Sequence, residues 1–233
     1  MITEGKIRDW YNKKHTVMRE KAWRPYEAYP VFLKYLNVKP GKNLLDIGCG
    51  TGYLLRAANA KKMNTYGVDI SDKAIEITKK ESPNSVVFAG EGESLSFESE
   101  KFNYITCLGA LEHFLDMNKA LQEMKRVAKR DARFLIMVPN VNNHFWKKSG
   151  KFGTAQQDIN ERLFSLQEWK NIFLKNGFKI LHIYQDRWFM KNIKIFSSLN
   201  PLKIMKRLIG KLEWLLLPLD KTYQFIFIMQ KDN

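Results

Sequence analysis

The chain has 233 residues, of which 45% are hydrophobic, which suffices for one globular domain with a buried core and excludes a disordered protein. Its 39 lysine and arginine residues against 24 aspartate and glutamate residues give a net charge of +15. Two cysteines exclude a disulfide framework, favour a reducing cytoplasmic setting and predict no metal site. The polar start of the chain, with no run of about 18 apolar residues, predicts that it does not span a membrane.

The positive charge is unevenly distributed. Residues 41–118 carry 8 basic against 11 acidic residues, whereas the excess lies in 1–40 (9 against 4), 119–153 (9 against 2) and 187–221 (8 against 2). This pattern favours an anionic partner, which could be a phosphorylated substrate, nucleic acid or an acidic membrane surface. Lysines spread over solvated faces for solubility are the alternative interpretation.

Residues 1–40 predict an N-terminal helical extension that is unusually aromatic for a polar leader, with Trp10, Tyr11, Trp23, Tyr26 and Tyr29. Such an extension can cover a ligand site as a lid. Aromatic packing of the helix onto the rest of the domain is the competing interpretation.

A predicted strand at 43–48 runs directly into a glycine-rich turn, 48–52, and then a helix at 52–60. Glycines at alternate positions let the backbone adopt positive φ and approach a ligand closely. The spacing D-x-G-x-G-x-G differs from that of phosphate-binding loops, and no lysine follows to hold a triphosphate. The turn therefore predicts a nucleoside site.

The next predicted strand, 64–69, ends in Asp69, at the βαβ spacing that places an acid beside a ribose diol. A carboxylate can accept hydrogen bonds from both ribose hydroxyls. The alternative is that the glycines form an ordinary turn and Asp69 caps the helix that opens at Ser71.

Further strands are predicted at 85–89, 102–108, 132–138, 178–186 and 223–230, with helices at 72–81 and 117–129. Strands that alternate with helices predict an α/β fold with a parallel sheet and helices on both faces. No repeat or linker divides the chain, so we expect one domain at 41–233 after the extension.

A basic amphipathic helix is predicted at 200–217, within an insertion at about 190–220. Its apolar residues recur at helical spacing, and its other side carries Lys203, Lys206, Arg207 and Lys211. A helix of this kind can lie on an anionic membrane surface, which predicts peripheral membrane contact. Packing on the domain or formation of a dimer face is the alternative, and the oligomeric state is not predicted.

The stretch Asp46-x-Gly48-x-Gly50-x-Gly52, together with Asp69, resembles the class I S-adenosylmethionine (SAM) dependent methyltransferases. Leu111-Glu112-His113-Phe114 resembles the ubiquinone/menaquinone-biosynthesis-like branch over roughly residues 40–140. Asn103 and Ser96 depart from that branch's usual aspartate and proline. The resemblance implies a Rossmann-like, seven-stranded, mostly parallel sheet whose last strand inserts antiparallel beside strand six.

The resemblance also implies a cofactor, SAM, with S-adenosylhomocysteine as product. Glu91 would accept the adenine amino group, the Gly92 N–H would reach a ring nitrogen, and Arg24 would pair with the cofactor carboxylate in a bidentate fork. The full set of expected cofactor-binding residues is Asp46, Gly48, Cys49, Gly50, Gly52, Asp69, Ile70, Glu91, Gly92, Leu108 and Arg24.

His113 is the leading candidate for a catalytic base because histidine titrates near neutrality and follows the fourth strand here. The alternative is that it orders the loop; His15 and His144 are weaker candidates.

Cys107-Leu108-Gly109-Ala110 lacks the [Asn/Asp]-Pro-Pro-[Tyr/Phe] motif of methyltransferases that act on base or glutamine amines. We therefore expect transfer to a small-molecule or lipid- or glycan-linked acceptor, at oxygen. RNA, for example tRNA, is the alternative acceptor, although no RNA-binding module is evident.

Overall fold

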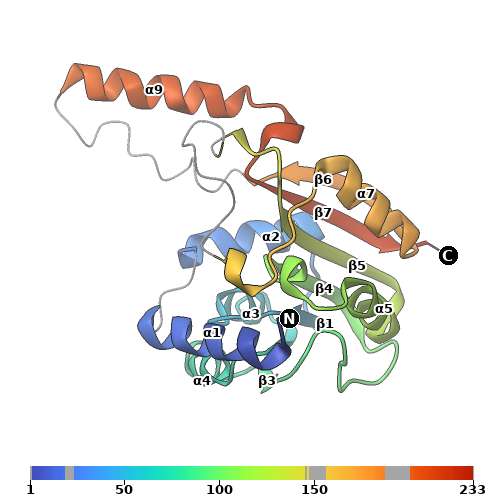
Figure 1. The fold of residues 1–233 in the computed structure, drawn as a ribbon. Helices are drawn as coiled ribbons and strands as arrows, with labels where there is room; N and C mark the ends of the chain where they lie inside the picture. Colours follow the sequence, from blue (N-terminus) through green and yellow to red (C-terminus); the bar gives the residue numbers. More distant parts are fainter. Residues whose placement is uncertain (1, 19–23, 145, 147–155, 187–199, 233) are drawn as a thin grey trace.

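The computed structural model describes residues 2–18, 24–144, 146, 156–186 and 200–232. Seven strands form one sheet in the order β3-β2-β1-β4-β5-β7-β6 (Figure 1). The pairs formed by β1 to β5 are parallel, and β7 is antiparallel to both β5 and β6. The predicted Rossmann-like sheet with an antiparallel last strand beside strand six is confirmed.

The strands are β1 (Asn43–Ile47), β2 (Asn64–Asp69), β3 (Val86–Ala89), β4 (Phe102–Leu108), β5 (Ala128–Pro139), β6 (Phe178–Gln185) and β7 (Gln224–Lys231). The α-helices are α1 (Glu4–Met18), α2 (Tyr29–Leu36), α3 (Tyr53–Asn59), α4 (Asp72–Glu81), α5 (Met117–Val127), α7 (Leu166–Lys175) and α9 (Pro201–Leu215). Short 3-10 turns are η1 (Tyr26–Ala28), η2 (Leu111–His113), η3 (Gln157–Ile159) and η4 (Leu219–Lys221).

Helices cover both faces of the sheet because neighbouring residues of each strand point to opposite sides. Leu45 of β1 belongs to the apolar core under α5 and α7, whereas its neighbour Leu44 belongs to the core under α2 and α3. Trp169 of α7 is fully buried and donates its indole N–H to the Pro139 carbonyl at 2.9 Å, which joins α7 to the end of β5.

Three elements, α5, β5 and α7, differ from the prediction. The structure ends α5 at Val127 and starts β5 at Ala128, whereas the sequence predicted a helix to 129 and a strand from 132. Ala128 takes an extended backbone and pairs with Phe102 of β4, so sheet pairing overrides the helical pattern. Helix α7 was not predicted, although Ser165 and Glu168 form a capping box at its start.

The predicted basic helix is present as α9, with Asn200 accepting hydrogen bonds from the Leu202 and Lys203 N–H groups and Pro201 in its first turn. It protrudes from the molecule, away from the sheet and from the other described helices (Figure 1). The first part of the predicted insertion, up to residue 199, and the aromatic Trp23 lie outside the described residues. In the part of the chain that is described, no helix is long and apolar enough to cross a bilayer.

Candidate functional site

A cavity of about 270 Å³ opens at the carboxyl ends of β1, β2, β3 and β4. The sheet order reverses between β1 and β4, and open α/β sheets bind ligands at such a switch point. The cavity brings together eight of the twelve residues that the sequence singled out, which are Gly48, Gly50, Asp69, Ile70, Glu91, Gly92, Leu108 and His113.

The glycine turn forms the floor of the cavity, and its backbone requires glycine. Gly48, Gly50 and Gly52 have φ values of +71°, +53° and +77°. A Cβ added at Gly48 would lie 2.5 Å from the Cβ of Ala110, far inside van der Waals contact. The glycines therefore permit both the positive φ and the close approach of the turn to the loop after β4.

Asp69 joins the second predicted motif to the first. Its Oδ2 accepts the Gly50 N–H at 2.8 Å, and its Oδ1 accepts the Ser71 N–H at 2.9 Å. The side chain is buried, and burial raises its pKa, although the two N–H donors oppose this. Each carboxylate oxygen can accept a second hydrogen bond, so Asp69 can still bind a diol at the cavity wall.

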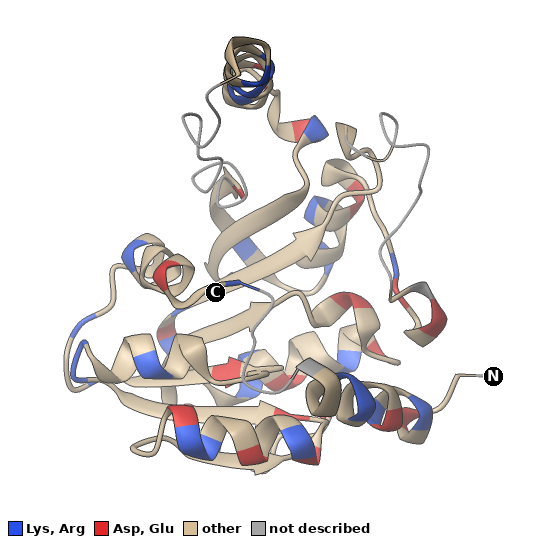
Figure 2. Cartoon of the chain, turned by 90° about the vertical axis from the view of Figure 1, so that its left-hand side faces the viewer, with Lys and Arg blue, Asp and Glu red and all other residues tan. Residues whose placement is uncertain are grey.

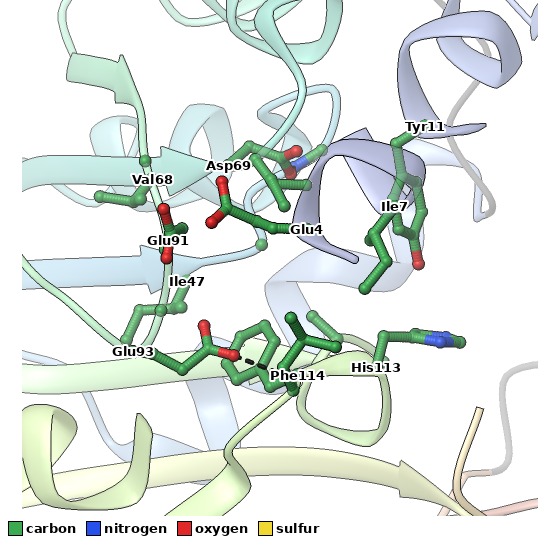
Figure 3. Close-up of a pocket in the computed structure, with 18 of the residues that line it drawn as sticks. Glu4, Ile7, Tyr11, Ile47, Val68, Asp69, Glu91, Glu93, His113 and Phe114 are labelled. Carbon is green, nitrogen blue, oxygen red and sulfur yellow. Dashed lines mark hydrogen bonds between the residues drawn. The ribbon is translucent and has the colours of Figure 1, made fainter. Parts of the chain in front are cut away.

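Acidic side chains gather at the end of the cavity formed by the turn after β3. Burial, and then the neighbouring Glu4 and Glu93, raise the pKa of Glu91. Glu4 comes from α1 and lies across from Glu91 (Figure 3). The backbone of Gly92 lies directly against Phe114, because an added Cβ would be 2.5 Å from the ring. A flat group that carries an N–H donor suits this end of the cavity.

Helix α1 covers the cavity, which Glu4, Ile7, Tyr11 and His15 line from above (Figure 3). Asn12 fixes the helix to the start of α4, since its Oδ1 accepts the hydroxyl of the N-cap residue Ser71 at 2.7 Å. The sequence named Tyr11 and His15 in this extension, but not Glu4 or Ile7. Helical spacing of 4, 7, 11 and 15 is the signal that could have identified one face of a helix.

His113 lies in η2 and lines the cavity beside Tyr11, with ring centroids 6.1 Å apart at 78°. Its Nδ1 is 3.2 Å from the Ile159 carbonyl oxygen. Because a carbonyl only accepts, Nδ1 carries the proton and Nε2 carries the lone pair. Burial lowers the pKa of His113 to about 4, so the ring is neutral at physiological pH.

The loop that carries His113 is held by a segment distant in sequence. The side-chain amide of Asn160 donates to the Phe114 carbonyl at 3.1 Å, and the Arg162 guanidinium donates to the Leu115 carbonyl at 2.7 Å. Sequence reasoning did not identify either residue. More than 40 residues separate each pair, and no local pattern signals the contact.

Three predicted cofactor residues lie beneath the cavity and do not line it. Asp46 accepts the Thr106 hydroxyl at 2.6 Å within the sheet, and burial raises its pKa to about 7. The Cys49 side chain faces Gly67 of β2, where an added Cβ would lie 3.0 Å from Sγ. Gly52 begins α3 against Thr78. These three residues therefore shape the turn or its start and do not contact the cavity.

Arg24 is also absent from the cavity wall. It forms the bidentate fork expected of it, but with Asp186 of the chain, at 3.1 Å from Nη1 to Oδ1 and 2.6 Å from Nη2 to Oδ2. Nη2 also donates to Gln224 Oε1 at 2.5 Å. With Asp186 buried, this ion pair ties the segment before α2 to the ends of β6 and β7.

The cavity fits a cationic nucleoside. Five acidic residues line it, which are Glu4, Asp69, Glu91, Glu93 and Asp116. The basic side chain among the described lining residues is that of Lys119. SAM carries a sulfonium and an ammonium group against one carboxylate and is therefore net positive. The turn, the remaining hydrogen-bond acceptor capacity of Asp69 and this excess of carboxylates match its adenosine and its charge.

A family model described as a methyltransferase domain matches residues 19–183, more than half of the chain. The chain belongs to this methyltransferase family. It is a SAM-dependent methyltransferase with a Rossmann-like sheet. The ubiquinone/menaquinone-type resemblance expected from the sequence is confirmed among its relatives.

One relative is an uncharacterized methyltransferase, YcgJ, of Bacillus subtilis, 29% identical over 72% of this chain and 67% of the relative. Another is a ubiquinone biosynthesis O-methyltransferase of Nitrosomonas europaea, 32% identical over 50% of this chain. The chain spans 54% of that second protein.

Among solved structures, the fold is similar to a chain of the complex between the Haloferax volcanii Trm112 methyltransferase activator and the putative methyltransferase. The TM-score is 0.69 at 17% identity, over 98% of each chain. This likeness concerns the fold.

Proposed function

We propose that the enzyme transfers a methyl group from SAM to an oxygen atom of a small-molecule or lipid- or glycan-linked acceptor. The observation that carries the proposal is the position of His113, in a wall of the same cavity whose other walls are Gly48, Asp69 and Glu91. A proton acceptor and a cofactor site share one enclosed space, as transfer to a hydroxyl requires.

The residues divide into those for the cofactor and those for the acceptor. Gly48, Gly50, Asp69, Glu91 and Gly92 would hold the adenosine part, while α1 excludes water from above. Bound SAM supplies an electrophilic methyl group on sulfur. The task of the chain is to align the acceptor oxygen in line with that methyl group, and such alignment can contribute roughly 7–11 kcal/mol.

His113 would take the proton of the acceptor hydroxyl at Nε2. The Ile159 carbonyl fixes the tautomer, and the lowered pKa keeps the lone pair available. The same low pKa makes the imidazole a weak base. We therefore expect its contribution at the lower end of the usual range for general bases, about a hundredfold.

Two observations support oxygen as the target. The relative from Nitrosomonas europaea is named an O-methyltransferase. The segment Cys107-Leu108-Gly109-Ala110, at the end of β4, has no proline or asparagine to receive an exocyclic amine. The net charge of +15 keeps RNA as the alternative acceptor.

A labelled-methyl assay tests the proposal. The protein is incubated with SAM labelled at the methyl group and with cell extract separated into lipid, RNA and small-molecule fractions. Label in the lipid or small-molecule fraction, stable to base as an ether, is expected. Label in RNA would establish the alternative, and label on nitrogen would contradict the oxygen assignment.

His113→Ala should reduce this transfer about a hundredfold, and His182→Ala is the matched control. His182 is an exposed residue of β6 outside the cavity and should leave the rate unchanged. A normal rate for His113→Ala would remove the residue from the reaction.

A further inference from the structure

Helix α9 presents its apolar side chains to solvent. Leu202, Met205, Leu208, Ile209, Leu212, Leu215 and the adjoining Leu216 are 40% to 81% exposed. In α5, by contrast, the apolar residues Met117, Leu121 and Met124 are buried against the sheet. The exposed apolar residues of α9 are called the outer face below.

The orientation of α9 is the reverse of that of a helix packed on its own domain. At 100° per residue, the outer face spans less than half of the helix circumference. Arg207 is half-buried and Trp214 is buried, and both lie on the opposite side of the helix. The side that carries Trp214 faces the chain and the apolar side faces away, whereas an amphipathic helix of a globular domain buries its apolar side.

Basic residues of α9 lie along both edges of the outer face. Lys203, Lys206, Arg207 and Lys211 oppose a single acid, Glu213, within α9 (Figure 2). By helical geometry, Lys206 follows one edge of the outer face and Lys211 the other. Lysines in these positions can extend their ammonium groups past an apolar layer to a charged one.

We propose that α9 is a membrane-docking helix, whose outer face inserts into the interfacial layer of a bilayer that contains anionic lipids. A bilayer offers apolar chains for the leucines and anionic headgroups for the lysines along both edges. A second copy of this chain would bring two helices with the same excess of positive charge together. Nucleic acid would satisfy the lysines but leave the outer face in water.

Docking is peripheral, because α9 has 15 residues and a length of about 22 Å, and it lies in the plane of the surface. The proposal rests on α9 alone and does not depend on which acceptor the enzyme methylates.

Flotation of the full-length protein with lipid vesicles tests the proposal. The vesicles are phosphatidylcholine alone and phosphatidylcholine mixed with phosphatidylglycerol, each at low and at high salt. We expect binding to the anionic vesicles that weakens as salt is raised, and little binding to phosphatidylcholine alone. Equal binding to both vesicles, or none to either, would overturn the proposal.

Two variants separate the contributions of the charges and of the outer face. Lys206→Gln with Lys211→Gln should weaken binding about thirtyfold, from about 1 kcal/mol for each lysine near an anionic surface. Lys79→Gln with Lys80→Gln is the matched control, since these lysines are exposed on α4, and it should bind as the unmodified protein does. Equal losses in both double variants would point to general charge attraction and contradict the proposal.

Leu208→Gln with Leu212→Gln tests the outer face itself and should reduce vesicle binding at least about tenfold. The stabilisation by SAM should be unchanged in this variant, which separates a docking defect from a folding defect. If the substitutions instead convert a dimer into a monomer in light scattering, the outer face is a subunit contact and the proposal fails. Retention of vesicle binding would also overturn it.

Discussion

The glycine turn gives the sharpest prediction, because a second glycine with the same backbone angle provides its control. Gly48 and Gly41 both have φ of +71°. An added Cβ at Gly41 has no atom within 4 Å, whereas at Gly48 it would lie 2.5 Å from the Ala110 Cβ. Alanine at either site costs about 1 kcal/mol of unfolding free energy for the left-handed backbone. At Gly48 overpacking adds about 2 kcal/mol more.

For a chain of this length, 1 kcal/mol corresponds to roughly 3 °C in Tm. Gly41→Ala should therefore lower Tm by about 3 °C, and Gly48→Ala by about 9 °C. The unmodified protein should gain about 8 °C at a SAM concentration a hundred times its Kd, as should Gly41→Ala.

Scanning calorimetry with and without SAM measures both effects. Relief of the clash at Gly48 requires the turn and the loop after β4 to separate, which deforms the cavity floor. Gly48→Ala should therefore lose most of the SAM-dependent gain. Equal Tm values for the two alanine variants, with an equal gain from SAM, would refute the assignment of the turn as the floor of the cofactor site.

Burial raises the pKa of Asp69 and of Glu91. If their ionised forms hold the cofactor as we propose, SAM affinity should fall as pH drops from 8 toward 5, beginning above the usual carboxyl range. An affinity that does not change over this interval in titration calorimetry would contradict this. Burial raises the pKa of Glu112 from 4.5 to about 8, so its stabilising effect is complete below pH 4.5 and is lost as pH rises through 8. Glu112→Gln should therefore be more stable than the unmodified protein at pH 9, by about 5 kcal/mol, and the advantage should vanish near pH 4. Urea unfolding that shows no such pH dependence would contradict the assignment of a buried carboxyl at Glu112. Arg24→Met removes the guanidinium that pairs with the buried Asp186 and should cost about 3–5 kcal/mol in the same assay. Arg56→Met breaks a pair with Glu81 in which the arginine is exposed, and it should cost under about 1 kcal/mol. Similar losses would show that burial of the pair adds nothing.

The fold was largely predictable because its signals are local. The glycine turn, Asp69 and the apolar strands each occupy a few consecutive residues, and their order specifies a parallel sheet. The start of β5 was not predictable in this way. Ala128 continues an apolar helical pattern after Val127, and only its pairing with Phe102 in a neighbouring strand makes it extended.

The site was predictable on the cofactor side and less so elsewhere. Asp69 ends a strand and Glu91 closely follows one, so the order of the strands places both side chains at the cavity. Arg24 shows the limit: a guanidinium fork suits any carboxylate, and the sequence could not indicate that Asp186, 162 residues away, would provide it. The contacts of Asn160 and Arg162 with the loop after β4 are equally non-local.

We propose that SAM binds beneath α1, with Asp69 holding its ribose. Titration calorimetry of SAM into the protein and into Asp69→Ala tests it most directly, with Glu98→Ala as an exposed acidic control outside the cavity. We expect one SAM per chain. Loss of two hydrogen bonds to a charged group should weaken binding at least about a hundredfold in Asp69→Ala and leave Glu98→Ala unchanged. Undiminished binding to Asp69→Ala, or no binding to the unmodified protein, would contradict the claim.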